Sequence, residues 1–261
     1  MPRRFYSFIL LFTFAVAARG VHAQQTYDIV IANGRVIDPE SGLDAVRFVG
    51  VRGGKIAAIS PTPLSGKTVL DAKGLVVSPG FIDLHAHGQN DENYRIFALD
   101  GVTTALELEV GTEDVPGFYA SRVGKALINY GASSGHVRAR MVVMRDPSSG
   151  LLPTGPGGHQ VATDAEIDAI TKHVDAGLAA GALGVGMGLQ YTPAASKYEV
   201  LQVFRTAAKY HAPVFVHVRG YGTQDPGSSV ESFMEVIGAS AISGAPVHIV
   251  HLNSMSLSST P

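Results

Sequence analysis

Two histidines stand one residue apart in the segment FIDLHAH, residues 81–87. In a β-strand, residues two apart point to the same face, so His85 and His87 would lie together at the end of this apolar run. Imidazole is a common ligand of divalent metals, and the pair therefore predicts one half of a metal site. A pair of surface histidines in a turn is the alternative interpretation of this segment alone.

Two later apolar runs also end in histidine: APVFVH ends at His217 and APVHIVH ends at His251. The carboxyl ends of parallel strands are where α/β proteins assemble their sites. Strand parity separates His251 from His248, because residues three apart face opposite sides of a strand, and His248 is expected to pack among helices. We therefore predict that the metal ligands are His85, His87, His217 and His251.

A carboxylate is expected between these histidines, because neutral imidazoles do not compensate the charge of two divalent ions and the chain has no cysteine. The segment GVTTALELEVG offers Glu107 and Glu109 on one face of an otherwise apolar strand. Glu109, nearer the carboxyl end, is the predicted bridging ligand, and Glu107 is the alternative bridge. A solvated strand face would be the other interpretation. One or two zinc ions are predicted, with another divalent metal as the alternative.

The elements that must position these residues change in character near residue 78. Residues 27–77 contain short β-rich runs punctuated by Asn-Gly and Gly-Gly, which predicts a small antiparallel β unit. After Pro79, apolar runs alternate with helical patterns, which is typical of parallel strands joined by crossover helices in an α/β fold. Strands are expected at 81–87, 103–110, 137–144, 183–188, 214–217 and 247–251.

Helix signals separate these strands. Thr163 with Glu166, and Ser196 with Glu199, have the spacing of capping boxes, and a further helix is expected to end at Gly244. The Gly- and Pro-rich segment 146–160 is expected to form a mobile loop over the site.

Composition limits the partners. The chain has 261 residues, 46% of them hydrophobic, and a formal net charge of -2. It therefore lacks the basic field that nucleic acid or an anionic membrane would require, and a small molecule is the expected partner.

The first 23 residues form a segment of their own. Residues 1–23 begin with Arg3 and Arg4, continue into an apolar stretch and end in VHA, which predicts a cleaved signal peptide and a periplasmic or extracellular protein with no membrane anchorage after cleavage. A membrane anchor is the alternative, but the apolar stretch is shorter than the roughly 20 residues of a span.

The segments SPGFIDLHAHG and GVTT, followed by single histidines that end later strands, resemble the metal-dependent amidohydrolase superfamily. Within it, GLQYTP at 188–193, HVRGYG at 217–222 and HIVHLNS at 248–254 are similar to the D-aminoacylase, or N-acyl-D-amino-acid deacylase, branch. The resemblance implies that residues 24–78 are the N-terminal part of a small β-sandwich and residues 79–261 a (β/α)8 TIM-like barrel with about six strands present. It also implies hydrolysis of a non-peptide C–N bond in a small amide by metal-activated water.

Two departures from the family pattern bear on the metals. The fourth barrel strand, ALGVGMGLQY, lacks the lysine that bridges the metals in many members, and the cysteine that D-aminoacylases carry after GVTT is absent here. The bridge must then be acidic or absent. The aspartate that the family uses as general base at the end of the eighth strand is not found, so it is expected beyond Pro261, in a chain that looks truncated at its C-terminus.

Two further residues are candidates for substrate binding. Arg219, two residues after His217, could hold a substrate carboxylate through two hydrogen bonds, with a structural ion pair as the alternative. Tyr191 could donate its hydroxyl to the substrate, although an aromatic residue in a loop often simply packs. Two other functions stay open: a cyclic-amide hydrolase resembling dihydroorotase or hydantoinase, and a catalytically silent fragment that binds metal.

Overall fold

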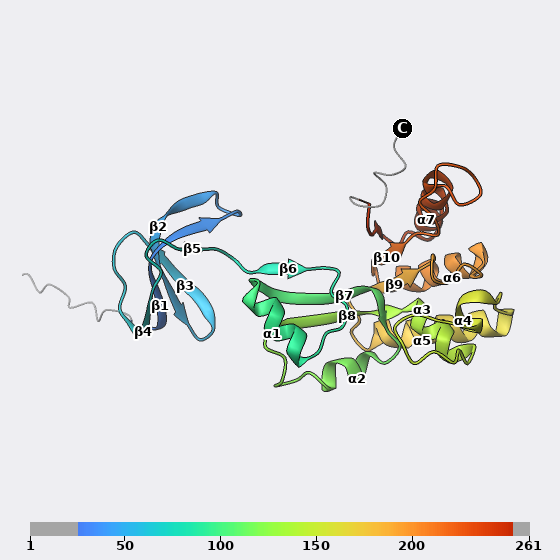
Figure 1. Cartoon of the computed structure of the whole chain (residues 1–261), viewed down its shortest axis with the longest axis horizontal. Helices are drawn as coiled ribbons and strands as arrows, with labels where there is room; N and C mark the ends of the chain where they lie inside the picture. The colour runs from blue at the N-terminus through green and yellow to red at the C-terminus, as the bar shows by residue number, and fades with distance from the viewer. Residues whose placement is uncertain (1–25, 253–261) are drawn as a thin grey trace, which may run out of the picture. The chain divides into compact units, whose positions relative to one another are not determined.

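The structure, a computed structural model, describes residues 26–252, which form two compact units that meet in the sequence at Pro79 and Gly80 (Figure 1). The predicted signal peptide, residues 1–23, lies outside the described residues, as do residues 253–261. Within the described part, no helix has both the length and the apolar character needed to cross a bilayer.

The first unit is a five-stranded sheet in the order β3-β2-β1-β4, with β5 also paired to β1. Its strands are β1 (Tyr27–Asp38), β2 (Leu43–Arg52), β3 (Lys55–Ser60), β4 (Gly66–Asp71) and β5 (Val76–Val77). Strands β1, β2 and β3 pair antiparallel, as expected, but β4 and β5 run parallel to β1. The prediction of a wholly antiparallel unit is therefore wrong. The connection after β3 contains Pro61 and Pro63 and makes no tight hairpin, so β4 pairs with β1 instead of β3.

The Asn-Gly pair at 33–34 does not form a turn. Asn33 has a φ of 64°, and the register of β1 against β2 shifts between Ile31 and Gly34, which marks a bulge within one long strand. A Cβ on Gly34 would lie 2.5 Å from the side chain of Val77, so glycine lets β5 approach β1 closely.

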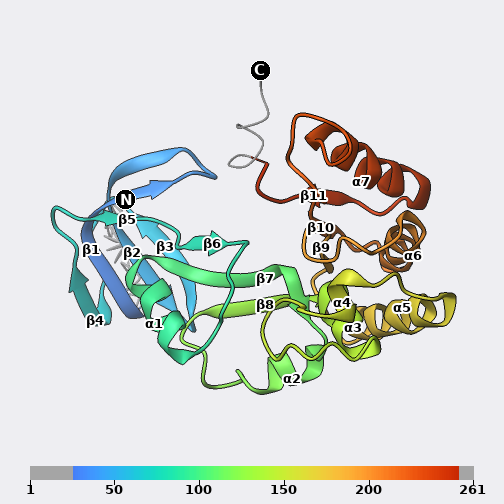
Figure 2. The same cartoon turned by 45° about the vertical axis from the view of Figure 1, so that its right-hand side comes forward.

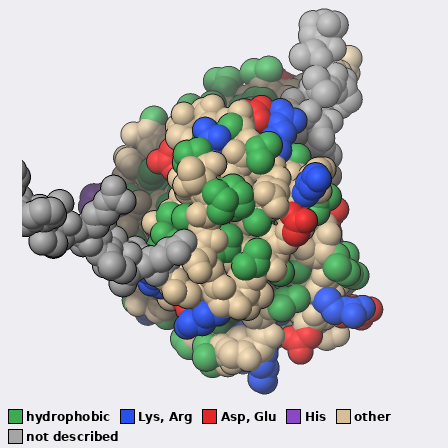
Figure 3. Space-filling model, turned by 90° about the vertical axis from the view of Figure 1, so that its left-hand side faces the viewer, with side chains coloured by type: hydrophobic (Ala, Val, Ile, Leu, Met, Phe, Trp, Pro, Cys, Tyr) green, Lys and Arg blue, Asp and Glu red, His purple; other side chains and the backbone are tan. Residues whose placement is uncertain are grey.

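The core of the first unit is small. Tyr27, Val30 and Ala32 form its buried cluster, whereas Val46 and Ile56 are among several large apolar side chains that stay exposed. The face shown in Figure 3 displays hydrophobic side chains scattered between charged ones.

The second unit is an α/β fold built on a six-stranded sheet in the order β11-β10-β9-β8-β7-β6, and every neighbouring pair is parallel (Figure 2). Neighbours in the sheet are also consecutive in the chain, because helices connect one strand to the next, and the sheet curls as part of a barrel. The strands are β6 (Phe81–Asp83), β7 (Val102–Thr112), β8 (Asn129–Gly135), β9 (Val185–Gly188), β10 (Val214–His217) and β11 (Val247–Ile249).

The helices follow the expected alternation. They are α1 (Asp91–Leu99), α2 (Val115–Ala120), α3 (His136–Val143), α4 (Pro156–His159), α5 (Asp164–Ala179), α6 (Lys197–Ala208) and α7 (Ser229–Ser243). Thr163 and Glu166 make the reciprocal capping box at the start of α5, and Gly244 ends α7 with a φ of 81°. Fully buried apolar side chains of β9 and β10, such as Met187 and Val216, share one core with residues of α5 and α6 such as Ile170.

The third strand of this sheet was predicted in the wrong place. Residues 137–144 form most of helix α3, and the strand is β8, NYGASSG, which precedes it. The small polar residues of β8 give no hydrophobic signal, but they suit its surroundings. A Cβ on Gly131 would meet Leu183 at 2.5 Å, and the hydroxyl of Ser133 donates to the carbonyl of Leu108 at 2.8 Å. Close packing on both faces therefore selects small residues here.

Candidate metal centre

Strand β7 carries Glu107 and Glu109 to the carboxyl end of the sheet with both side chains on its inner face. Glu107 is 6% exposed and Glu109 is 1% exposed, which agrees with the same-face spacing in the sequence. Because ionised carboxylates in such an environment need partners, the groups around them define the site.

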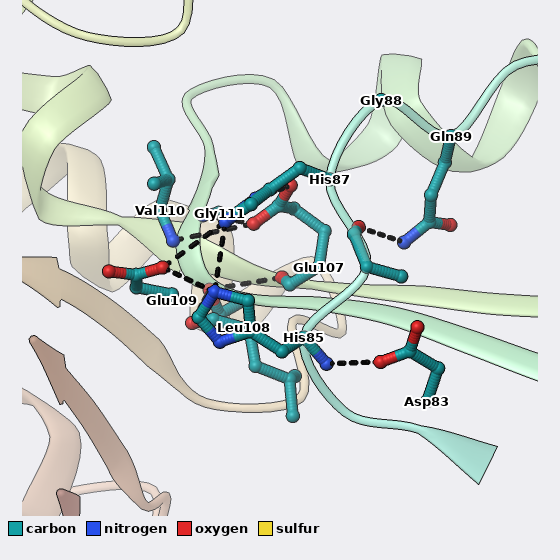
Figure 4. Close-up of polar contacts among 12 residues, drawn as sticks. Asp83, His85, His87, Gly88, Gln89, Glu107, Leu108, Glu109, Val110 and Gly111 are labelled. Carbon is teal, nitrogen blue, oxygen red and sulfur yellow. Dashed lines mark hydrogen bonds and ion pairs between the residues drawn. The ribbon is translucent and has the colours of Figure 1, made fainter. Parts of the chain in front are cut away.

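Glu109 contacts the imidazoles of all the histidines that were predicted as ligands. Its Oε2 lies 2.7 Å from Nε2 of His85 and 3.1 Å from Nε2 of His87 (Figure 4). Its Oε1 contacts Nδ1 of His217 and lies 3.5 Å from Nε2 of His251. The carboxylate of Glu109 therefore lies between two histidine pairs, one following β6 at one edge of the sheet and the other at the ends of β10 and β11 near the opposite edge.

These contacts form two groups that could each hold a metal ion, one of His85, His87 and Glu109 and the other of Glu109, His217 and His251. In each group the donor atoms lie within 4.8 Å of one another. Nitrogen and oxygen donors of this kind suit zinc, and three protein ligands leave a fourth position open, as in catalytic zinc sites. The donor set thus fits two divalent ions that share Glu109.

His85 and His87 reach the site from a turn. Strand β6 ends at Asp83, so both histidines lie beyond it, and the expectation that the strand continues to His87 is wrong. Asp83 accepts a hydrogen bond from the backbone N–H of His85 at 2.9 Å, and the buried amide of Gln89 donates to the carbonyl of Ala86 at 3.1 Å. These bonds set the path of the turn, and both rings still face Glu109 (Figure 4).

Glu107 orients His87 and belongs to neither metal group. Its Oε2 lies 2.8 Å from Nδ1 of His87, while Nε2 of the same ring faces Glu109. A carboxylate behind a metal-binding histidine fixes the ring and its tautomer. The geometry therefore separates the two glutamates: Glu109 lies where a bridge is needed, and Glu107 supports one histidine.

The electrostatics of the site favour ionised glutamate. Burial alone would raise the pKa of Glu109, but hydrogen bonds with His217, His85 and His87 outweigh it and hold the pKa far below its usual range. Hydrogen bonds that the carboxylates of Glu107 and Glu109 accept from its ring raise the pKa of His87 to about 10. The pKa of His251 is lowered, mainly by burial.

His217 has two further partners from the loop that follows β9. The amide oxygen of Gln190 contacts its Nε2, and the hydroxyl of Tyr191 lies 3.4 Å from its Nδ1. Tyr191 was predicted at the site and is placed there. Gln190 was missed, because a glutamine in a loop carries no signal of its own. The only clue was its place between β9 and Tyr191 in GLQYTP.

The guanidinium of Arg219 is hydrogen-bonded to other groups of the protein. Its guanidinium makes two hydrogen bonds to Glu235 of α7, at 3.0 and 2.7 Å, and donates to the carbonyls of Pro193 and Ala195 at 2.8 and 2.9 Å. These contacts favour the structural ion pair over the carboxylate clamp. On β11, His248 is exposed and stacks on Phe215, which shares a strand face with His217, so the expectation that His248 packs among helices is wrong. Strand β11 ends at Ile249, so the expected strand to His251 is also too long, and His251 lies in the turn that follows.

A buried ionic cluster was not found from the sequence at all. Arg140 of α3 donates to both carboxylate oxygens of Glu199 on α6, at 2.7 and 2.5 Å, and Nε2 of His136 lies 2.7 Å from the same carboxylate. All three side chains are fully buried. Burial raises the pKa of Glu199, but the hydrogen bond from His136 and the charge of Arg140 lower it to about 2.

A cavity of about 450 Å³ lies beside the metal groups on the side of Glu107. Its lining includes Gln89 after β6, Arg122 after α2 and Arg138 of α3. It could admit a small substrate to the carboxyl end of the sheet.

Comparisons with known proteins agree with this geometry. Residues 68–251 match the amidohydrolase family. The chain is 29% identical to a D-aminoacylase from Alcaligenes xylosoxydans xylosoxydans over 245 residues, covering 80% of this chain and 48% of that protein. A crystal structure of N-acyl-D-glutamate deacylase from Bordetella bronchiseptica, complexed with zinc and a phosphonate inhibitor, matches with a TM-score of 0.70 and 25% identity over 85% of this chain and 51% of that one.

A shorter match is to a protein with a different name. A stretch of 60 residues, 23% of this chain, is 53% identical to part of a dihydroorotase from Solibacter usitatus and covers 14% of that protein. The chain spans about half the length of the D-aminoacylase and of the deacylase that it matches.

Proposed function

Because this chain belongs to the amidohydrolase family, we propose that it serves the hydrolysis of amide bonds in small N-acyl amino acids, most like the N-acyl-D-amino-acid deacylases. The observation that carries the proposal is the position of Glu109, whose carboxylate contacts His85, His87, His217 and His251. The similarity to the D-aminoacylase and to the zinc-containing deacylase supports the choice of substrate class.

The residues of the chain have distinct parts in this proposal. The two histidine pairs and Glu109 would hold one or two zinc ions, or another divalent metal. When bound, zinc would supply Lewis acidity to the amide carbonyl and would lower the pKa of water towards about 7. Glu107 fixes the ring of His87, and Tyr191 places its hydroxyl beside His217, where it could donate a hydrogen bond to the substrate.

Metal content tests the centre. We expect the wild-type chain to bind up to two zinc ions and the double variant His85→Ala/His87→Ala to lose tight binding. His248→Ala is the matched control, because His248 lies three residues before His251 but belongs to neither metal group. Unchanged zinc content in the double variant would refute the assignment.

A panel of amides tests the substrate class. N-acyl-D-amino acids, their L enantiomers and cyclic amides such as dihydroorotate are offered to the zinc-loaded chain. Preference for the linear D substrates is the expected result. Preference for the cyclic amides would favour the second candidate, which the match to dihydroorotase supports. Zinc binding without turnover of any amide would favour a catalytically silent metal-binding chain.

We also propose that residues 1–23 direct export to the periplasm or beyond and are then removed. The charged start, the apolar stretch and the VHA segment support this proposal. Mass spectrometry of the secreted protein should give an N-terminus at Gln24. A protein that keeps Met1 in the cytoplasm would contradict it.

A further inference from the structure

The loop 189–196 between β9 and α6 presents two side chains to His217. Gln190 contacts Nε2 of this ring, and the ring of Tyr191 lies 4.8 Å from it, centre to centre. The loop contains no helix or strand. Besides its own turn hydrogen bonds and the bond from the N–H of Leu189 to the carbonyl of His217, at 2.8 Å, it receives support through two arginines, each paired with a glutamate.

The first pair is Arg219 with Glu235. The guanidinium binds both carboxylate oxygens of Glu235 and uses further N–H groups for the carbonyls of Pro193 and Ala195. The side chain of Glu235 is 5% exposed, so the pair is largely shielded from water. Arg219 follows His217 by two residues and therefore ties the loop directly to the segment that carries this histidine.

The second pair is Arg140 with Glu199, which lies in the first turn of α6, just after the loop. Besides Glu199, Arg140 donates to the carbonyls of Gly157 and Gln160, both at 2.6 Å. Between these two residues, the carbonyl of Gly158 accepts a hydrogen bond from the N–H of Ala194 at 3.3 Å. Arg140 thus holds residues 157–160, and this segment is hydrogen-bonded to the loop at Ala194.

Glu199 also departs from its expected local role. In a capping box its carboxylate would bind the backbone N–H of Ser196, as that of Glu166 binds Thr163. Here the N–H of Glu199 donates to Ser196, but the carboxylate turns to Arg140 and His136. The start of α6 therefore makes only one of the two capping-box hydrogen bonds, and Glu199 instead links the first turn of α6 to α3.

We propose that these two arginine–glutamate pairs are positioning residues for the metal centre. They hold the loop 189–196 in place so that Gln190 and Tyr191 fix the ring of His217 towards Glu109. The inference rests on the proposed function, because it concerns the affinity for a metal at His217. It also gives Arg219 a role that does not involve substrate.

The test measures zinc affinity without substrate, by competition with a chelator, in a double-mutant cycle. The variants are Glu235→Gln, Gln190→Ala and the two combined. Groups that support a metal ligand typically contribute about 10–100-fold in affinity. We expect about tenfold weaker binding of one of the two ions in each single variant. The combined variant should be much less than a hundredfold weaker, because both changes act through the same contact.

A matched control and a second variant complete the experiment. Glu166→Gln changes a glutamate at the start of α5 whose carboxylate accepts hydrogen bonds from Thr163, and it should leave zinc affinity unchanged. Arg219→Lys keeps the charge but loses the planar set of donors, and it replaces Glu235→Gln in the cycle if that variant gives no folded protein.

The outcomes separate this inference from the proposed function. A wild-type chain that binds no zinc would defeat the proposed function. A wild-type chain that binds zinc, with Glu235→Gln at full affinity or with effects that multiply in the combined variant, would overturn only the positioning role. A higher KM for N-acyl amino acids in Arg219→Lys, at unchanged zinc affinity, would also overturn it in favour of substrate binding.

Discussion

At the scale of single residues, Glu107 and Glu109 are two glutamates of one strand that contact different sets of histidines. Both are buried on the inner face of β7, yet Glu109 contacts both histidine pairs and Glu107 contacts only His87 and the backbone N–H groups of Val110 and Gly111. The two side chains lie two residues apart along the strand, and this step decides which histidines each carboxylate can reach.

We expect Glu109→Gln to lower the affinity for both zinc ions, because the amide carries no charge and cannot serve both histidine pairs as a carboxylate does. Glu107→Gln should weaken binding at the His85 and His87 side by about 10–100-fold and leave the other side intact. Zinc titration of the two variants distinguishes these results. A larger loss in Glu107→Gln would move the bridge to Glu107.

At the scale of elements, hydrogen bonds hold the segment 146–160, which was expected to be a mobile loop. The carboxylate of Asp146 accepts hydrogen bonds from the backbone N–H groups of Ser148, Thr154, Gly155 and Gly157, at 2.8 to 3.1 Å. These bonds lower its pKa although burial opposes them. The glycines suit the close turns around one carboxylate, which sequence composition alone cannot distinguish from flexibility.

Asp146→Asn should loosen this loop, because an amide has one acceptor oxygen in place of two. We expect faster hydrogen–deuterium exchange at residues 148–157 and earlier cleavage by proteases there, with unchanged exchange in β9 and β10. Ser149→Ala is a control in the same segment, since Ser149 is exposed. Equal exchange in the Asp146→Asn variant and the wild type would show that the backbone does not depend on this carboxylate.

The buried cluster of Arg140, Glu199 and His136 should govern stability in acid. The pKa of Glu199 falls from 4.5 to about 2 on folding, so its contribution is complete above about pH 4.5 and is lost as the pH falls towards 2. Glu199→Gln leaves Arg140 buried without a charged partner, and we expect it to lower the free energy of unfolding by about 3 kcal/mol at pH 7.

Urea denaturation at pH 7 and pH 3 checks this expectation. The gap between wild type and Glu199→Gln should narrow at the lower pH, because below about pH 4.5 Glu199 takes up a proton in the unfolded wild type, and part of the stabilisation is lost. The change Glu166→Gln, at a partly exposed position, should cost less than about 1 kcal/mol at pH 7. A gap that stays constant between the two pH values would contradict the role of this ion pair.

At the scale of the whole molecule, the metal groups lie entirely within the second unit, from Gly80 on. A ligand that binds only the folded state stabilises the part that holds it, by about 2.7 kcal/mol at a hundred times its Kd. For a domain of this size we expect zinc to raise the Tm of the second unit by roughly 5–10 °C.

Hydrogen–deuterium exchange with and without zinc assigns this effect to one unit. Protection should increase at the carboxyl ends of β7 and β10 and stay unchanged in β1 to β4. In His85→Ala/His87→Ala, zinc should give a much smaller change in either measurement. Equal protection of both units in the wild type would mean that zinc acts outside the proposed site.

The sequence by itself determined the components that repeat with a fixed period. Alternation in β7 put Glu107 and Glu109 on one face, and the apolar run before His217 placed it at the end of a parallel strand. His251 follows the next strand, β11, but lies two residues beyond its end. The fold class of the second unit followed from the same alternation of strands and helices. These features are local, because a strand's period of two and a helix's period of 3.6 act within one segment.

The tertiary structure decided what depends on contacts between distant segments. It turned the carboxylate of Glu199 from its own helix cap to Arg140, paired Arg219 with Glu235, and placed Gln190 on His217. It also made β8 a strand despite its small polar residues, since close packing against its neighbours, not hydrophobicity, selects them. Partner choice among buried charges is settled by which side chains the fold brings together, and no local spacing encodes it.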